Sequence, residues 1–382
     1  MTHPTFTFAT ATEIRFGRGT AADAVPDLAR LGRRLLLVTG ASALRSAWLP
    51  EALATEGCET TVFSVPGEPD VAMIEAGVAA ARLMGAQAVI AIGGGAVVDA
   101  GKAIAALVPA TRPMLDHLEV VGRGLPLEQP PLPFVALPTT AGTGAEVTRN
   151  AVIAVPEARR KVSLRDRAML PDLAIVDPSL TDACPRAVTL ASGLDAITQV
   201  IEPYLCTRAN PMTDALCRDA ILVGLTALRT LMDREDPEAR DAMAWVSLCG
   251  GLALANAGLG VVHGLAGPLG GLTGAAHGAI CGVLLPHGLT LNDARVVDPK
   301  VRARLNEVRD WIAQALGCAP DIAFDSLAHW ASDCGLPALT DLGVTADAQA
   351  QAAEAAASSS SMKANPVALS AEDLRGMMAQ AG

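Results

Sequence analysis

The chain has 382 residues, of which 51% are hydrophobic and only 3% aromatic, and its net charge is −11. Phosphate backbones and anionic lipid would repel such a chain, so it is not expected to bind nucleic acid or a membrane surface. Its length allows two domains. Eight scattered cysteines with no CxxC motif indicate buried thiols in a reducing, cytoplasmic setting, and the first residues have no signal-peptide pattern.

The first half of the chain alternates short apolar runs with helical patterns, which predicts a parallel sheet covered by helices on both faces. The strand runs are 33–40, 60–67, 87–95, 132–140 and 172–180. After residue 182 the strand pattern stops. Helical periodicity then dominates, as in 191–205, 215–232, 241–258 and 302–317. The prediction is an α/β domain over 1–182 and an all-α domain over 183–382.

A long uncharged stretch lies between Ala242 and Asn292, with no Asp, Glu, Lys or Arg. Hydropathy by itself would suggest a membrane span there. The stretch is rich in glycine, contains Asn256 and His263, and lacks flanking basic clusters and an aromatic belt. A buried helix of a large domain explains it better.

Three glycines, Gly93, Gly94 and Gly95, end one predicted strand and open a helix. Glycine lets the backbone approach a phosphate closely, and a helix N-terminus presents free N–H groups to an anion. A dinucleotide pyrophosphate is therefore the expected ligand. The alternative is a tight turn without a ligand, because no GxGxxG fingerprint follows the first strand.

A threonine-rich loop over 137–150 follows the next strand, with hydroxyls at Thr139, Thr140, Thr143 and Thr148. Such groups suit contacts with phosphate, ribose and amide, although an ordinary Ser/Thr turn has the same composition. Lys161 could reach a phosphate or ribose. Its alternative is a solvated basic surface, since Arg159 and Arg160 adjoin it.

Polar groups within apolar helices suggest a metal site. His263, His277 and His287 lie in the most apolar region, and Asp195 sits on the helical run 191–205 with Gln199 one turn later. A carboxylate and two imidazoles form a common ligand set for a divalent metal. The alternative is hydrogen-bonded core histidines without an ion.

Five segments appear in order: GGGAVVDAGKAIA, LPTTAGTGAEVTRNAVI, GLDAITQVIEP, VVHGLAGPLGG and AAHGAICGVLLPHG. Together they resemble the iron-containing (group III) alcohol dehydrogenase family, which has a dehydroquinate synthase-like fold. The resemblance runs from about Phe8 to Pro366. It implies an N-terminal NAD(P)-binding domain, a helical domain that binds one divalent metal (Fe or Zn), and a cleft between them. The implied reaction moves a hydride between NAD(P) and an alcohol, aldehyde or ketone.

Matched position by position, the resemblance implies which residues carry these roles. The catalytic residues would be Asp195, His263 and His277, which also bind the metal. The cofactor-binding residues would be Gly93, Gly94, Gly95, Asp99, Thr139, Thr140, Thr143 and Lys161.

Two positions depart from the family pattern. Gln199 stands where a metal histidine is usual, and Gly267 where a second histidine is common. Gln199 can still ligate through its carbonyl oxygen, so we expect a retained ion with weaker affinity. Gly267 cannot relay a proton, which leaves water or a cofactor hydroxyl for that role. The alternatives are a metal-free reductase of the maleylacetate reductase type and a catalytically silent nucleotide-binding relative.

The first strand ends in VTGAS, with Gly40 and Ser42 in place of an acidic residue that would repel a 2′-phosphate. We therefore expect NADP(H) to be accepted as well as NAD(H). The substrate is expected to be a small molecule, and the family resemblance implies a homo-oligomer, a dimer in the simplest case.

Overall fold

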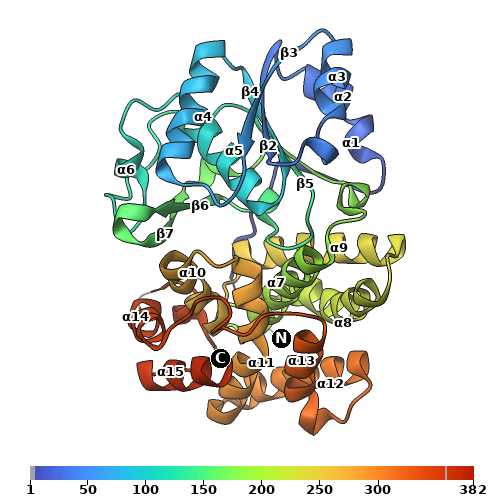
Figure 1. The fold of residues 1–382 in the computed structure, drawn as a ribbon, viewed down its shortest axis with the longest axis vertical. Helices are drawn as coiled ribbons and strands as arrows, with labels where there is room; N and C mark the ends of the chain where they lie inside the picture. The colour runs from blue at the N-terminus through green and yellow to red at the C-terminus, as the bar shows by residue number, and fades with distance from the viewer. Residues whose placement is uncertain (1–4, 358) are drawn as a thin grey trace. The chain divides into compact units, whose positions relative to one another are not determined.

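The computed structural model describes residues 5–357 and 359–382; residues 1–4, at the start of the predicted first domain, and residue 358, in the second, lie outside it. The chain forms two compact units (Figure 1). The α/β unit comprises Thr10–Thr140 and Gly144–Asp182, and the helical unit comprises Ala183–Gly382 with two segments from earlier in the chain.

Those two segments, residues 5–9 and Ala141–Thr143, were predicted within the first domain but belong to the helical unit. The side-chain amide of Asn256 binds both backbone groups of Ala9, at 2.6 and 2.9 Å. A Cβ at Gly142 would lie 2.9 Å from that of Ser192, so this segment packs closely on a helix of the helical unit. These contacts join residues that are far apart in the sequence, so local sequence patterns do not reveal them.

The α/β unit is built on a six-stranded parallel sheet in the order β1-β8-β5-β4-β2-β3. The five predicted strand runs correspond to β2, β3, β4, β5 and β8, and the predicted parallel α/β class is confirmed. The edge strand β1 was not predicted, because it is short and mostly exposed. The strands are β1 (Glu13–Phe16), β2 (Arg34–Gly40), β3 (Glu59–Val65), β4 (Ala88–Gly93), β5 (Phe134–Pro138) and β8 (Leu173–Val176).

Helices cover both faces of this sheet. Successive side chains of a strand point to opposite faces, so each buried strand contributes residues to two cores. Leu35 and Leu37 of β2 join the core formed with α1 (Thr20–Asp23), α2 (Val25–Ala29) and α3 (Trp48–Thr55). Leu36 and Val38 join the opposite core. That core also contains α4 (Val71–Met84), α5 (Gly95–Leu107), α6 (Met114–His117) and the antiparallel hairpin of β6 (Asn150–Val155) and β7 (Arg160–Arg165).

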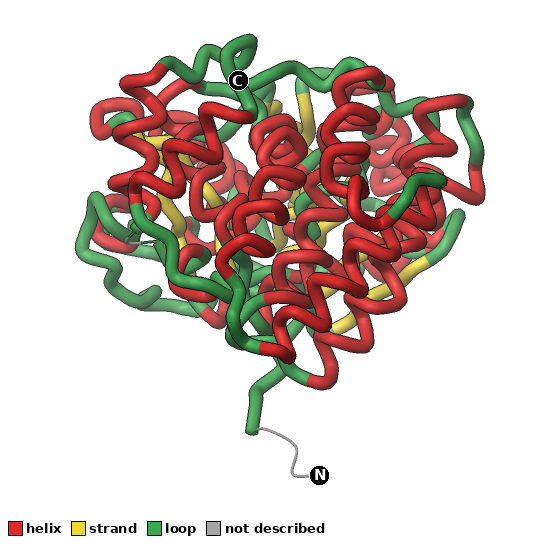
Figure 2. Tube along the Cα trace, turned by 90° about the horizontal axis from the view of Figure 1, so that it is seen from below, coloured by secondary structure: helices red, strands yellow, loops and turns green. Residues whose placement is uncertain are grey.

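The helical unit is organised around α7, which packs against α8, α9 and α11. Helices predominate in the described chain (Figure 2). A second core joins α10, α11, α14 and α15. The helices are α7 (Arg186–Leu205), α8 (Pro211–Asp233), α9 (Pro237–Asn256), α10 (Val261–Thr273), α11 (His277–Arg295), α12 (Pro299–Leu316), α13 (Ala323–Asp333), α14 (Ala346–Ala356) and α15 (Ala371–Gln380).

Among the described helices, none is by itself long and apolar enough to cross a membrane. Only α9 and α10 taken together meet the criteria of length and composition, and that pair bends by 95°.

Candidate metal centre and cofactor edge

Asp195 lies in the middle of α7, where nearly every neighbouring side chain is buried. Its own exposed fraction is 1%. Its Oδ1 atom is buried and accepts no hydrogen bond from any residue that the structure describes. A carboxylate oxygen buried in this way is costly unless a cation or a donor compensates it. The atom therefore marks a place where a positive group is expected.

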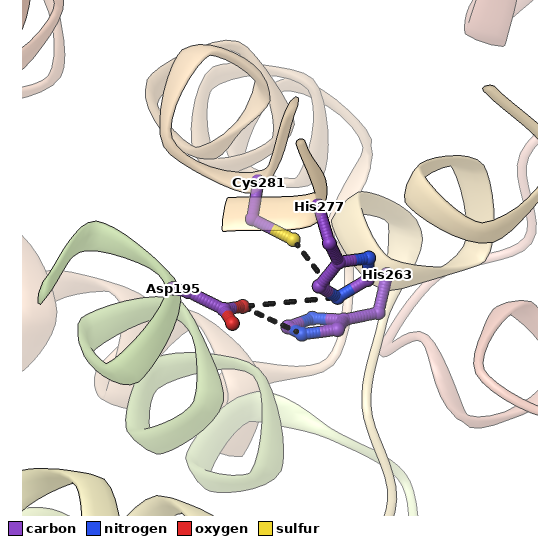
Figure 3. A group of neighbouring side chains, drawn as sticks. All are labelled: Asp195, His263, His277 and Cys281. Carbon is purple, nitrogen blue, oxygen red and sulfur yellow. Dashed lines mark hydrogen bonds and ion pairs between the residues drawn. The ribbon is translucent and has the colours of Figure 1, made fainter. Parts of the chain in front are cut away.

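Two imidazoles from later helices meet this carboxylate (Figure 3). His263, in the first turn of α10, places Nε2 3.3 Å from Oδ1 of Asp195. His277, the first residue of α11, places Nε2 3.9 Å from the same oxygen. One ligand atom from each of Asp195, His263, His277 and Cys281 lies within 4.8 Å of the others. Oxygen, nitrogen and sulfur donors thus converge on one point, and this set fits a divalent transition metal.

A glycine brings α11 close enough to α7 for this convergence. A Cβ at Gly278 would lie 2.6 Å from the carbonyl oxygen of Ala191 and 3.4 Å from Cβ of Asp195. Any larger residue would force the two helices apart. Gly278 therefore places His277, the preceding residue, beside Asp195.

Glu202 orients His263 from the side opposite Asp195. Its Oε2 lies 2.7 Å from Nδ1 of His263, and its Oε1 accepts the backbone N–H of Val262 at 2.7 Å. The carboxylate thus occupies the N-terminus of α10, where negative charge is favoured. Holding Nδ1 leaves Nε2 free for an ion, as in other histidine metal sites.

Sequence reasoning missed both Glu202 and Cys281. Glu202 follows Asp195 by seven residues and Cys281 follows His277 by four, so each shares a helix face with a named residue. These two spacings could have identified Glu202 and Cys281 from the sequence.

The charges in this cluster depend on one another. Burial by itself lowers the pKa of His277, but the neighbouring Cys281 and Asp195 outweigh it and raise that pKa to about 9. Burial also opposes ionisation of Asp195, yet the positive charge of His277 and the contact with His263 hold the pKa of Asp195 below its usual value. The pocket therefore holds its carboxylate ionised and concentrates positive charge next to it.

The residues predicted beside this cluster have other surroundings. Gln199 is buried on α7, and its Nε2 donates a hydrogen bond to the carbonyl oxygen of Gly142 at 2.7 Å. At Gly267, one turn after His263, an added Cβ would meet nothing within 4 Å. His287, further along α11, is not part of the four-residue group.

The predicted phosphate-binding glycines lie at the carboxyl edge of the sheet. Gly40 ends β2 and Gly93 ends the neighbouring strand β4. From β2 the chain runs to β3 on one side and then to β4 on the other, so the strand order reverses between them. Ligands of open α/β sheets bind at such a switch point. Gly94 caps α5, and a Cβ there would lie 3.3 Å from Oγ1 of Thr140.

Several predicted cofactor residues surround this edge. The N–H of Thr139 donates to the carbonyl oxygen of Gly93 at 2.9 Å, and Ser42 lies exposed after β2. Asp99 on α5 accepts the N–H of Val152 at 3.0 Å, which ties the helix to β6. Thr143, by contrast, belongs to the segment of the helical unit.

Lys161 lies on β7, with a side chain that is only 8% exposed. Its Nζ makes no hydrogen bond within the described part of the chain, and the Oε1 atom of Glu68 lies 3.5 Å away. A buried ammonium with unused donors is a natural partner for an anionic ligand.

Comparison with known families decides the identity. The family profile described as iron-containing alcohol dehydrogenase matches residues 11–178, and the profile of the family's C-terminal part matches residues 189–382. The chain belongs to the iron-containing alcohol dehydrogenase family. Members of this family are NAD-dependent oxidoreductases that act on alcohols and aldehydes. The chain is therefore an enzyme of that class, with a divalent metal as a second cofactor.

Individual relatives of this alcohol dehydrogenase agree along most of its length. Alcohol dehydrogenase 4 of Schizosaccharomyces pombe is 34% identical, covering 86% of this chain and 78% of its own. Lactaldehyde reductase of Escherichia coli is 32% identical, covering 94% and 95%. The crystal structure of a 1,3-propanediol oxidoreductase is 30% identical and superposes with a TM-score of 0.88 over 99% of this chain and all of that one.

Proposed function

We propose that this alcohol dehydrogenase uses Asp195, His263 and His277 as its catalytic centre and as the protein ligands of its divalent ion. The observation that carries the proposal is the buried Oδ1 of Asp195, which has no hydrogen-bond donor yet faces two imidazole nitrogens at 3.3 and 3.9 Å. A metal-free reductase would need a donor on that oxygen. A catalytically silent relative would have no reason to keep three polar groups in so apolar a place.

When bound, a divalent ion polarises a carbonyl oxygen as a Lewis acid and lowers the pKa of an alcohol. The chain's own residues prepare the site for this. Glu202 holds the ring of His263 through Nδ1, so that Nε2 faces Asp195. Asp195 offers an anionic oxygen from the buried interior of α7. Gly267 bears no proton donor, so we assign proton delivery to water or to a hydroxyl of the cofactor.

For the cofactor, we propose the carboxyl edge of the sheet in the α/β unit. Gly93, Gly94 and Gly95 would receive the pyrophosphate at the start of α5, and Thr139 and Thr140 would supply hydroxyls. Asp99 would keep α5 attached to β6 through its bond to Val152. Lys161 would donate to a phosphate or ribose oxygen, which the unused donors of its Nζ support.

Elemental analysis of purified protein, joined to a screen of short aldehydes with and without a chelator, tests the metal assignment. We expect close to one equivalent of a divalent transition metal and loss of turnover on its removal, restored by adding it back. His263→Ala should abolish both metal binding and turnover. His287→Ala changes a histidine of the same apolar stretch outside the cluster, and it should leave metal binding and turnover in place. Full activity in metal-free protein would overturn the assignment in favour of the metal-free reductase.

Acceptance of NADP(H) is proposed from the absence of an acidic side chain at Gly40 and Ser42. The expected kcat/KM with NADP(H) is at least a tenth of that with NAD(H). A smaller ratio would contradict the proposal. Ser42→Asp should lower kcat/KM for NADP(H) and leave that for NAD(H) little changed, because the new carboxylate would repel a 2′-phosphate.

The remaining proposals concern setting and substrate. We propose a cytoplasmic location, which the eight free cysteines support. We also propose a homodimer, the assembly that the family resemblance implies. Multi-angle light scattering tests the assembly. For substrates we propose small aliphatic aldehydes, since the relatives include a lactaldehyde reductase and a 1,3-propanediol oxidoreductase. A panel of aldehydes of increasing chain length and hydroxylation tests that choice.

A further inference from the structure

The first turn of α11 brings two potential ligands to the metal centre. His277 and Cys281 lie four residues apart on one helix face, and Sγ of Cys281 is 3.6 Å from Nε2 of His277 (Figure 3). The Cys281 side chain is fully buried. Its sulfur belongs to the same group of ligand atoms as Asp195 and His263.

Two of the separations within this group are close to the edges of a tetrahedral site. Metal–ligand lengths of about 2.0 Å for oxygen and nitrogen and about 2.3 Å for sulfur give edges of roughly 3.3 Å between N and O and roughly 3.5 Å between N and S. The observed separations are 3.3 Å from His263 to Asp195 and 3.6 Å from His277 to Cys281. The separation of His277 and Asp195 is longer, at 3.9 Å.

The amide nitrogen of Gln199, the residue named from the sequence as the fourth ligand, is held by a backbone carbonyl. This nitrogen donates to the carbonyl oxygen of Gly142 at 2.7 Å, within the helical unit. That bond fixes the orientation of the amide and ties the segment Ala141–Thr143 to α7. Asp195 keeps a buried oxygen that has no hydrogen-bond donor among the described residues, which indicates a cation in the group of ligand atoms that includes Cys281.

We propose that Cys281 provides a thiolate as the fourth protein ligand of the ion, in the place expected for Gln199. The inference rests on the proposed metal site of Asp195, His263 and His277. The resulting shell of one oxygen, two nitrogens and one sulfur is softer than a shell with an amide oxygen, so the site favours Zn²⁺ and other thiophilic ions over Mg²⁺ or Mn²⁺. Substrate would then enter as a fifth ligand, an expansion known for catalytic zinc.

Cobalt substitution under anaerobic conditions tests the assignment without relying on turnover. Co²⁺ bound to wild-type protein should show a near-ultraviolet thiolate-to-metal charge-transfer band, and that band should be absent in Cys281→Ser. The serine variant should still bind one equivalent of Co²⁺ through Asp195, His263 and His277. Cys217→Ser, a buried cysteine of α8 outside the cluster, should keep the band.

Affinity measurements provide a second readout. The ratio of Cd²⁺ to Mn²⁺ affinity should fall at least tenfold in Cys281→Ser and should change less than threefold in Gln199→Ala. Circular dichroism of the metal-free variants checks that each one folds. If Cys281→Ser misfolds, Cys281→Ala and the charge-transfer band of the wild-type protein carry the test.

The outcomes distinguish failure of the thiolate assignment from failure of the proposed metal site. Wild-type protein that binds Co²⁺ without a charge-transfer band, or a Cys281→Ser variant that keeps the band, would overturn the thiolate ligand while leaving the proposed metal site intact. A large loss of affinity confined to Gln199→Ala would assign the fourth place to the amide instead. Wild-type protein that binds no divalent ion would refute the proposed function itself.

Discussion

Nδ1 of His263 lies 2.7 Å from Oε2 of Glu202, so that the opposite ring nitrogen faces Asp195. The same carboxylate accepts the N–H of Val262 at the start of α10. One buried group thus fixes both the helix terminus and the ring that the helix carries. The consequence is that the metal centre depends on a residue that does not itself belong to the ligand cluster.

Replacing Glu202 by Gln should weaken metal binding by roughly 10- to 100-fold, the usual cost of losing a carboxylate behind a metal-binding histidine. The amide is nearly isosteric and can still accept the N–H of Val262, so the helix start should survive. Competition with a chromogenic chelator measures the affinity. Glu354→Gln, an exposed position on α14, is the control and should bind metal like the wild type. Unchanged affinity in Glu202→Gln would show that the contact does not orient the ring.

Replacing Gly278 by Ala should destabilise the protein by about 1–3 kcal/mol, because the new methyl group would overlap the carbonyl oxygen of Ala191. The separation of α11 from α7 should also reduce metal affinity. Gly376→Ala is the matched control: it lies within α15, where an added Cβ meets nothing within 4 Å. That change should stabilise by about 0.5–1 kcal/mol through helix propensity. Thermal denaturation of both variants in chelator compares them, and equal behaviour would contradict the close approach.

Glu146 should make stability depend on pH. Burial raises the pKa of this carboxyl to about 7, although its backbone hydrogen bond and the charge of Lys102 oppose the shift. The folded protein therefore binds more protons than the unfolded chain between the ordinary pKa of 4.5 and 7, and stability falls as pH rises through that window.

Glu146→Gln removes this penalty, so the variant should gain about 2–3 kcal/mol on the wild type between pH 5 and pH 8. Melting temperatures of both proteins across that range, in one chelator-containing buffer series, measure the difference. Glu157→Gln, at an exposed position of the same unit, should track the wild type at every pH. A constant offset for Glu146→Gln would mean that Glu146 titrates normally.

Lys161→Met should weaken cofactor binding by roughly 10- to 100-fold, the usual effect of removing a charge-assisted hydrogen bond. The fold should tolerate the change, because the ammonium makes no hydrogen bond to any described residue and its one ion-pair partner, Glu68, is exposed. Titration of NADH or NADPH fluorescence measures the dissociation constant. Arg160→Met, the preceding and exposed residue on the other face of β7, is the control. Equal effects at the two positions would indicate general electrostatic attraction.

Much of the fold could be read from the sequence, since it depends on local patterns. The runs 35–38 and 88–92 are apolar at every position, as is typical of strands buried on both faces, and they lie in β2 and β4. The strands β1 and β7 were missed because they lack such a continuous apolar run. β1 has only four residues at a sheet edge, and β7 begins with two basic residues, Arg160 and Lys161, which are typical of a solvated surface.

The candidate site could be read only in part. Asp195, His263 and His277 were named because polar residues in apolar helices need a partner, and the structure brings them together. Thr143 was assigned with its neighbours in the loop, but the chain changes units between Thr140 and Gly144. A sequence motif does not show to which of the two units each of its residues belongs.

The sequence by itself determined the fold class, the order of the two units and the family, because hydrophobic periodicity and the order of motifs are properties of the linear chain. The tertiary structure decided which polar groups share a pocket. Glu202 contacts His263, and His277 and Cys281 lie beside Asp195, because α7, α10 and α11 pack closely, with Gly278 against Ala191. Gln199 bonds to Gly142 because the segment Ala141–Thr143 packs on α7. The direction of a side chain follows from the helix that bears it, but its partner follows from how the helices pack.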